Sequence, residues 1–166
     1  TQLCLERRDL TGACRHAARA LEVAEEHDPE RYLPLIRAHL ARALAPSRPD
    51  GARALLRAVK EVLAFAPVPR RAQTQMVAAW AYHALGEDKD AREQAEIVLA
   101  NSSSRGYRLL KLEALSLLCQ VGDPAERDAH RDAGRALARE FIASLSPELR
   151  RSFGRRPFLK NLEKKR

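Results

Sequence analysis

Apolar residues recur at helical spacing along most of the chain. Three series show the pattern: Ala13, Ala17, Ala20, Leu21 and Ala24; Ala52, Leu55, Leu56, Val59, Val62 and Leu63; and Tyr107, Leu110, Ala114, Leu117, Leu118 and Val121. The third stretch also carries Leu109, Leu112 and Leu115 on a second face. A helix that is apolar on two faces has to be buried between neighbouring helices.

Clusters of turn-forming and helix-capping residues separate these stretches. They lie at 8–9, 27–29, 46–50, 67–69, 86–88, 101–104, 122–124 and 146–147. The intervals predict about eight helices up to Leu145, followed by two shorter ones. Short connections make sequential helices antiparallel neighbours. We therefore expect an all-α fold built as a row of helical hairpins.

The chain also repeats itself. Three segments align without gaps and place Ala13, Ala52 and Ala91 at a constant interval of about 39 residues, within the range that is typical of stacked helix pairs. A fourth copy is expected after Gly122, with Ala129 in the alanine position. The pattern predicts an α-solenoid with this period: about four hairpins over 1–145, the first truncated, and basic capping helices over 146–166.

This pattern resembles the tetratricopeptide repeat, in which a turn, often Gly-Asp, precedes a helix with spaced small residues. Matching small, aromatic or apolar positions precede two of the turns, at Ala79 and Tyr82 and at Leu115 and Leu118. The spacing is a few positions longer than the usual repeat of that family, and Gln75 stands where its signature Trp is expected. The resemblance implies a protein-binding scaffold.

The segment from Ile142 to Leu162 resembles the end of the helical-repeat region in large bacterial regulators. Those proteins join a serine/threonine protein kinase, a nucleotide cyclase or a DNA-binding transcriptional activator to an ATPase module and then to repeats. This resemblance implies that the chain is the C-terminal sensory or scaffolding part of such a signalling regulator.

Charge and cysteine content narrow the setting. The net charge of +8 is concentrated at the C-terminal end, where 146–166 contains eight basic and two acidic residues. Three cysteines, Cys4, Cys14 and Cys119, cannot all pair within one chain, which favours a reducing, cytoplasmic location. No apolar run approaches the ~20 residues that a membrane-spanning helix needs.

No motif of catalysis, phosphate binding or zinc binding occurs in the sequence. The five histidines lack the spacing that would put two ligands on one helix face. The acidic residues Glu87, Asp88 and Asp90 are interpreted as a helix start, because acidic groups are favoured there. We therefore expect no enzyme activity, no cofactor and no metal site.

The first helix of each tetratricopeptide hairpin lines a concave groove. Mapping by the repeat register places these residues in a partner-binding groove: Arg37, Ala41, Gln73, Met76, Trp80, His83, Glu113, Ser116 and Gln120. Met76 and Trp80 share a helix face and suit an anchor for a partner's side chain. The alternative is that Trp80 packs between repeats. Met and Trp also replace the Lys and Asn of the family's clamp for a peptide carboxylate, which disfavours that activity.

The tail carries a basic patch, interleaved with Phe153 and Phe158. Its members are Arg150, Arg151, Arg155, Arg156, Lys160, Lys164, Lys165 and Arg166. One hypothesis is a contact with nucleic acid phosphates. The other is a helix that caps the last repeat and turns a solvated basic face outward. The expected partner of the whole chain is a protein, a peptide or another domain of the parent regulator, with nucleic acid as the alternative.

Overall fold

Helices account for almost all of the described chain. The computed structural model describes residues 1, 4–5, 9–27, 29–64, 68–103 and 107–163, without the side chains at 29–31, 68–69 and 103. Its helices are α2 (Leu10–His27), α3 (Pro29–Leu44), α4 (Pro49–Leu63), α5 (Val68–Ala84), α6 (Asp88–Ser103), α7 (Arg108–Val121), α8 (Arg127–Ala143), α9 (Pro147–Phe153) and α10 (Pro157–Glu163). These ranges contain no strand, so the all-α prediction is confirmed. None of the described helices is long and apolar enough to cross a membrane.

Most of the helices begin where the polar clusters predict. The starts of α2, α4, α6 and α8 are evenly spaced, at Leu10, Pro49, Asp88 and Arg127, and their spacing equals the interval of the sequence repeat. The two short helices expected after Leu145 are α9 and α10. The cluster at 101–104 predicts a break, but α6 continues through Ser103. The intrinsic helix propensity of serine is only a few tenths of a kcal/mol below that of alanine, so a short serine run does not force a break.

The described contacts divide the chain into two compact units, residues 1–94 (unit 1) and 95–166 (unit 2). The division falls within α6. Each unit is described by itself below.

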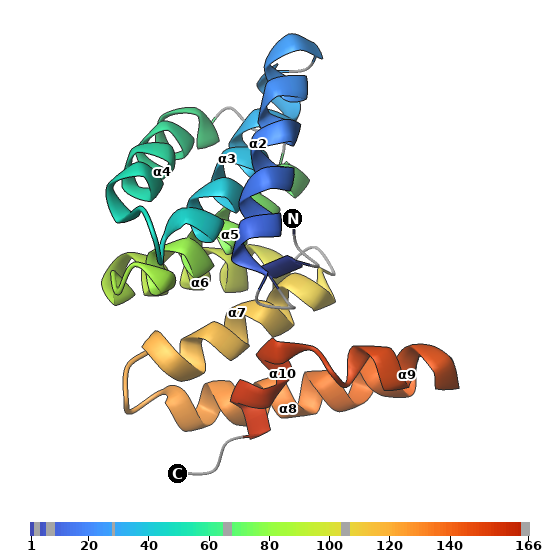
Figure 1. The fold of residues 1–166 in the computed structure, drawn as a ribbon. Coiled ribbons are helices and arrows are strands. Elements are labelled where there is room, and N and C mark those ends of the chain that lie inside the picture. The colour runs from blue at the N-terminus through green and yellow to red at the C-terminus, as the bar shows by residue number, and fades with distance from the viewer. Residues whose placement is uncertain (2–3, 6–8, 28, 65–67, 104–106, 164–166) are drawn as a thin grey trace. The chain divides into compact units, whose positions relative to one another are not determined.

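Alanine dominates the core of unit 1. Helix α3 lies at its centre and packs against α2, α4 and α5 (Figure 1). One buried cluster joins the ends of three of these helices and consists of Ala41, Ala45, Ala52, Leu56, Ala78 and Ala81. Small side chains let helix axes approach closely, which explains how α3 accommodates three helical neighbours.

Helices α3 and α5 run parallel, as two cross-helix contacts show. Near the start of both helices, the Arg70 guanidinium lies 4.5 Å from the centre of the Tyr32 ring. Near their ends, the Arg42 guanidinium lies 5.3 Å from the centre of the Trp80 ring. Tyr32 and Arg70 are separated by the same number of residues as Arg42 and Trp80. The two helices therefore keep the same alignment along the whole length of their contact.

The repeated alanines occupy equivalent positions in unit 1. Ala13, Ala52 and Ala91 are fully buried. Each backbone N–H donates to the carbonyl four residues earlier, just before the helix begins, with N···O distances of 2.9, 3.1 and 3.0 Å. The three alanines that align in the sequence therefore also occupy the same position relative to the start of their helices.

The expected fourth copy is misplaced by one residue. Ala129 is exposed, whereas Ala13, Ala52 and Ala91 are fully buried. The N–H of His130 instead donates to the Glu126 carbonyl at 3.0 Å, which is the contact that Ala91 makes one repeat earlier. The abundance of alanine in α8 makes Ala129 a misleading match.

Unit 2 is built on an antiparallel pair, α7 and α8, with α10 packed against both (Figure 1). Gly134 of α8 lies under Leu162 of α10, and a Cβ at Gly134 would come within 2.6 Å of the Leu162 Cδ2. The buried Ser116 hydroxyl of α7 donates to the Phe158 carbonyl at 2.6 Å. A glycine notch and a buried hydrogen bond thus hold α10 in place.

Helix α9 follows the end of α8. The Arg150 guanidinium donates to the carbonyls of Leu145 and Ala143 at 2.8 and 3.0 Å, which satisfies orphan acceptors at the α8 C-terminus. The Phe153 ring lies between those of Phe141 and Phe158, with centroid distances of 4.8 and 6.1 Å. Part of the basic patch therefore has a structural role.

Candidate functional site

Helix α5 has an accessible stripe along one side. Most of its described side chains in the middle of the helix are buried: Ala72, Thr74, Gln75, Met76, Ala78, Ala79 and Ala81. Exposed or half-buried positions recur three or four residues apart along the opposite side: Arg70, Gln73, Val77, Trp80 and Ala84. This spacing places them on one helix face. Trp80 is the largest of these side chains and lies partly open to solvent.

The matching stripe of α3 follows from the register between the two helices. It consists of Tyr32, Leu35, His39 and Arg42, all half-buried. We call this stripe, together with Arg70, Gln73, Val77 and Trp80, the α3–α5 face. Its two arginine–aromatic contacts hold flat, amphipathic groups side by side, and such groups are enriched where proteins bind one another.

The α3–α5 face is positively charged. Arg42 and Arg70 are its charged side chains, and none of the residues that define it is acidic. Burial lowers the pKa of His39 to about 4, with a further contribution from the Arg42 charge. His39 is therefore neutral at pH 7, and its Nδ1 is buried without a hydrogen-bond partner among the described residues.

Four of the predicted groove residues do not lie on this face. Ala41 and Met76 are fully buried, so neither side chain is available to a partner. Arg37 turns toward α2, where its Nη2 lies 3.9 Å from the Glu25 Oε1. The His83 Nδ1 lies 2.8 Å from the Asp88 Oδ1 at the start of α6. The repeat register assigns residues to helices, but packing between helices decides the direction of each side chain.

Gln73 and Trp80 do share the accessible stripe. Gln73 is exposed, and its Oε1 accepts a hydrogen bond from Arg70 at 3.1 Å. The sequence offers two hypotheses for Trp80, an anchor for a partner and a residue packed between repeats, and Trp80 has features of both. Arg42 of α3 covers part of its ring, and another part stays accessible. Its ring also makes an edge contact with His83 at 6.1 Å.

The remaining groove residues belong to unit 2. Ser116 is fully buried and engaged with α10, so it is a core residue. Glu113 and Gln120 are half-buried, and the Gln120 Nε2 is buried without a hydrogen-bond partner in the described part of the chain. The assignment of Glu113 and Gln120 to a groove stays a prediction.

The sequence reasoning missed Tyr32, Arg42, Arg70 and Val77. A signal for them was present, since Arg70, Val77 and Trp80 follow the spacing of one helix face. Tyr32 and Arg42 precede Arg70 and Trp80 by one common interval, close to that of the repeat. Only the contacts between α3 and α5 reveal that these two series face each other.

The basic patch is divided in its roles. Arg150 holds the end of α8, and the Arg156 guanidinium lies 5.9 Å from the centre of the Phe153 ring. Arg151, Arg155 and Lys160 are exposed. The predicted members Lys164, Lys165 and Arg166 lie outside the described residues.

The described part of the chain contains no cluster of three or more metal-binding side chains. Cys119 is buried, and burial raises the pKa of its thiol, which keeps it in the unreactive protonated form. Cys4 and Cys14 are half-buried rather than core residues, and all three thiols are free.

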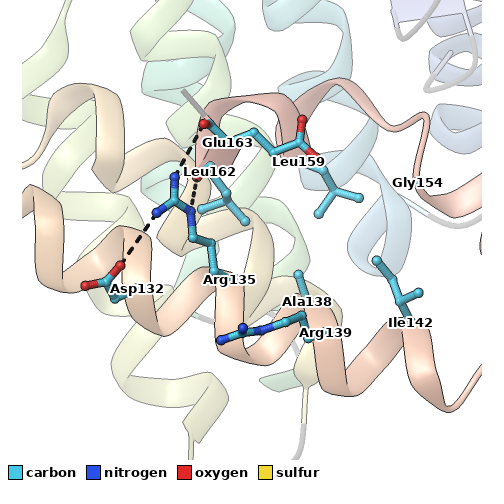
Figure 2. Close-up of a pocket in the computed structure, with 9 residues that line it drawn as sticks. All are labelled: Asp132, Arg135, Ala138, Arg139, Ile142, Gly154, Leu159, Leu162 and Glu163. Atoms are coloured by element: carbon cyan, nitrogen blue, oxygen red, sulfur yellow. Dashed lines mark hydrogen bonds and ion pairs between the residues drawn. The ribbon is translucent and has the colours of Figure 1, made fainter. Parts of the chain in front are cut away.

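Unit 2 contains a pocket between α8 and α10 (Figure 2). Its volume is about 480 Å³. Nine residues line it: Asp132, Arg135, Ala138, Arg139, Ile142, Gly154, Leu159, Leu162 and Glu163. The Arg135 guanidinium crosses from α8 to the end of α10, where it donates to the Leu162 carbonyl at 2.7 Å and the Glu163 carbonyl at 3.3 Å.

No protein-family model, curated protein or solved structure matches this chain. Its function is therefore inferred from the residues of the chain itself.

Proposed function

We propose that this chain is a non-catalytic scaffold of tetratricopeptide-like repeats that binds a protein partner through the α3–α5 face. The proposal covers the arrangement as an α-solenoid with the period of the sequence repeat. It includes a cytoplasmic location, which the cysteine content favours. It also includes a place at the C-terminal end of a bacterial signalling or transcription regulator, which the sequence resemblances favour.

The observation that carries the repeat assignment is the common interval of helix starts and contacts. Four helices start at even spacing, and equivalent N–H groups at 13, 52, 91 and 130 make equivalent hydrogen bonds. The parallel packing of α3 and α5 agrees, since first helices of successive hairpins are parallel neighbours in a solenoid. Together these features support stacked hairpins over a single bundle.

The observation that carries the docking assignment is the half-buried Trp80 on the accessible stripe of α5. Tryptophan, tyrosine and arginine dominate the energetics of protein interfaces, because each offers a large contact area with a polar edge. The α3–α5 face supplies all three types in two cross-helix pairs. Its excess of arginine favours partner segments with acidic side chains.

A photo-crosslinking amino acid at Gln73 tests this proposal. Gln73 is exposed on the same stripe of α5 as Trp80, and Ala54, an exposed residue of α4, is the matched control position. The proposal expects one partner to crosslink at position 73 and not at position 54. In a purified system, Trp80→Ala should then weaken that partner by roughly 30-fold, as expected of an interface anchor.

Val62→Ala is the control substitution, because Val62 is exposed on α4 away from the face. Equal crosslinking at both positions would contradict the assignment of the binding site to the α3–α5 face. So would an unchanged affinity for the partner in a folded Trp80→Ala variant.

A further inference from the structure

The α3–α5 face consists of four levels. At each level one residue of α3 is separated from one residue of α5 by the same interval along the chain. The levels are Tyr32 and Arg70, Leu35 and Gln73, His39 and Val77, and Arg42 and Trp80. The first and last pairs are in contact across the two helices. Because the helices run parallel, the two middle pairs lie at successive levels between these contacts.

The levels are spaced like the turns of a helix. Successive levels are three or four positions apart along α3, which corresponds to one helical turn of about 5.4 Å. Between Tyr32 and Arg42 the face covers ten positions (32 to 42) and therefore about 15 Å. A third helix lying along the face presents one side chain to each level, at i, i+3, i+7 and i+10.

An extended segment fits this surface less well. Side chains on one side of a strand recur every 6.7 Å or so, so a strand presents about three of them over about 15 Å and does not match four levels. Its backbone groups also need hydrogen-bond partners. The middle levels offer few, because Leu35 and Val77 are apolar and Gln73 accepts a hydrogen bond from Arg70. A helix satisfies its own backbone groups and needs no such partners.

The two ends of the face are cationic and its middle is neutral. Arg70 lies at the first level and Arg42 at the last, and none of the residues that define the face is acidic. Each guanidinium lies over an aromatic ring, and its N–H donors lie in the guanidinium plane rather than along the stacking direction. Burial lowers the pKa of His39 to about 4, followed in size by the positive charges of Arg42 and the N-terminal ammonium, so the ring is neutral at pH 7.

We propose that the partner segment of the α3–α5 face is an amphipathic helix with acidic residues at i and i+10 and apolar residues at i+3 and i+7. The acidic side chains pair with Arg70 and Arg42, and the apolar ones pack on Leu35 and Val77. This inference rests on the proposed function and adds the conformation and the sequence pattern of the partner.

A synthetic peptide with this pattern tests the inference. It has about 20 residues, enough to form a helix on its own, with glutamate at i and i+10, leucine at i+3 and i+7, and alanine and glutamine elsewhere. Trp80 is the only tryptophan of the chain, so its fluorescence reports binding at the face. Titration of the full chain should give saturable binding with a change in this fluorescence and a dissociation constant below about 1 mM.

Three altered peptides separate the contributions of charge, pattern and conformation. Lysine in place of both glutamates should weaken binding at least roughly tenfold, because both ends then meet a like charge. Moving one glutamate to the opposite side of the helix should weaken binding roughly threefold to tenfold. Proline at the centre of the peptide breaks the helix and should weaken binding at least roughly tenfold.

Charge reversal in the protein assigns the contact. Arg70→Glu should weaken binding of the peptide at least roughly tenfold, and a peptide with lysine in place of one glutamate should recover most of the affinity. If circular dichroism shows that this variant is unfolded, Arg42→Glu provides the same test at the other end of the face. Arg57→Glu, at an exposed arginine of α4, is the control and should bind as the unsubstituted chain does.

Absence of saturable binding by the helical peptide would overturn the inference. Equal affinity for the proline-containing or the lysine-containing peptide would do the same. If a partner crosslinks at position 73 although the helical peptide does not bind, the docking face stands and only its helical partner is excluded. Failure of the crosslinking as well would contradict the proposed function itself.

Discussion

Unit 1 and unit 2 bury different kinds of side chain. Small residues fill the seams of unit 1, where Ala41, Ala52 and Ala81 are fully buried between α3, α4 and α5. Large residues fill unit 2, where Leu112, Leu117 and Leu118 of α7 are buried and Leu162 closes over Gly134. Their charges differ too, since unit 1 has 15 basic and 13 acidic residues against 15 and nine in unit 2.

This difference indicates how each unit gains its stability. Alanine seams stabilise by close approach of helix backbones, so they leave no room for added volume. Leucine-rich packing stabilises by the apolar area removed from water, so it is sensitive to lost volume. The two units should therefore respond in opposite ways to substitutions that add or remove methylene groups.

The largest effect is expected where unit 2 loses volume. Leu162→Ala should lower the free energy of unfolding by about 3–4 kcal/mol, because Leu162 is only 2% exposed and covers Gly134. Urea unfolding measures the change. Leu149→Ala is the matched control, since Leu149 is 56% exposed and its loss should cost less than about 1 kcal/mol. Equal losses in the two variants would contradict the position of α10.

Added volume should destabilise unit 1. Ala52→Leu should cost about 2–3 kcal/mol, because the fully buried Ala52 lies in the cluster that joins α3, α4 and α5. Ala54→Leu on the exposed side of the same helix should be close to neutral. Thermal unfolding of both variants provides the comparison, and a tolerated Ala52→Leu would rule out a close seam.

Acidification should weaken unit 1 through His39. Its pKa of about 4 in the folded chain lies below the ordinary value of about 6.5, so the unfolded chain takes up the proton first. Stability should therefore begin to fall as the pH drops below about 6.5, and the loss is complete below about pH 4. The loss from pH 7 to pH 5 should be about 2 kcal/mol. Urea unfolding across this range measures it, and His39→Gln should give a flatter profile. An identical profile in the variant would show that His39 is not buried as a neutral ring.

The smallest effect is expected at the hydrogen bond between α7 and α10. Ser116→Ala removes the donor to the Phe158 carbonyl and should cost about 1 kcal/mol. Ser152→Ala, at an exposed serine of α9, is the control. Hydrogen exchange at α10 should rise in the first variant and stay constant in the second. Faster exchange at α10 in Ser152→Ala but not in Ser116→Ala would mean that the Ser116 hydrogen bond does not hold α10 in place.

Sequence patterns predicted most of the helices, because turn residues and apolar spacing act locally. Pro49, Gly122 and Pro147 mark helix ends through their own backbone preferences, and the starts of α4, α8 and α9 lie in or just after such clusters. The repeat identified Ala52 and Ala91 as equivalent positions, because repetition at a fixed interval can be recognised in the sequence without knowledge of contacts.

The candidate site was harder to predict, because it depends on which way side chains turn between helices. Met76 and Trp80 lie four positions apart, yet Met76 is buried in the core and Trp80 remains accessible. A helix with neighbours on several sides exposes a narrow stripe, and the roughly 40° by which four residues overshoot one turn is enough to leave it. The pairing of Arg42 with Trp80 joins residues from two helices, which the sequence alone does not connect.

Stacked repeats require α3 and α5 to be parallel, and the relative direction of these two helices tests that requirement most directly. Spin labels at Leu35 and Gln73, in a chain without its three cysteines, should lie roughly 10 Å apart, the spacing of packed helices. Labels at Leu35 and Ala84 should lie roughly 20 Å apart, because Ala84 lies about three turns further along α5. The reverse order of the two distances would mean antiparallel helices and would contradict the repeat assignment.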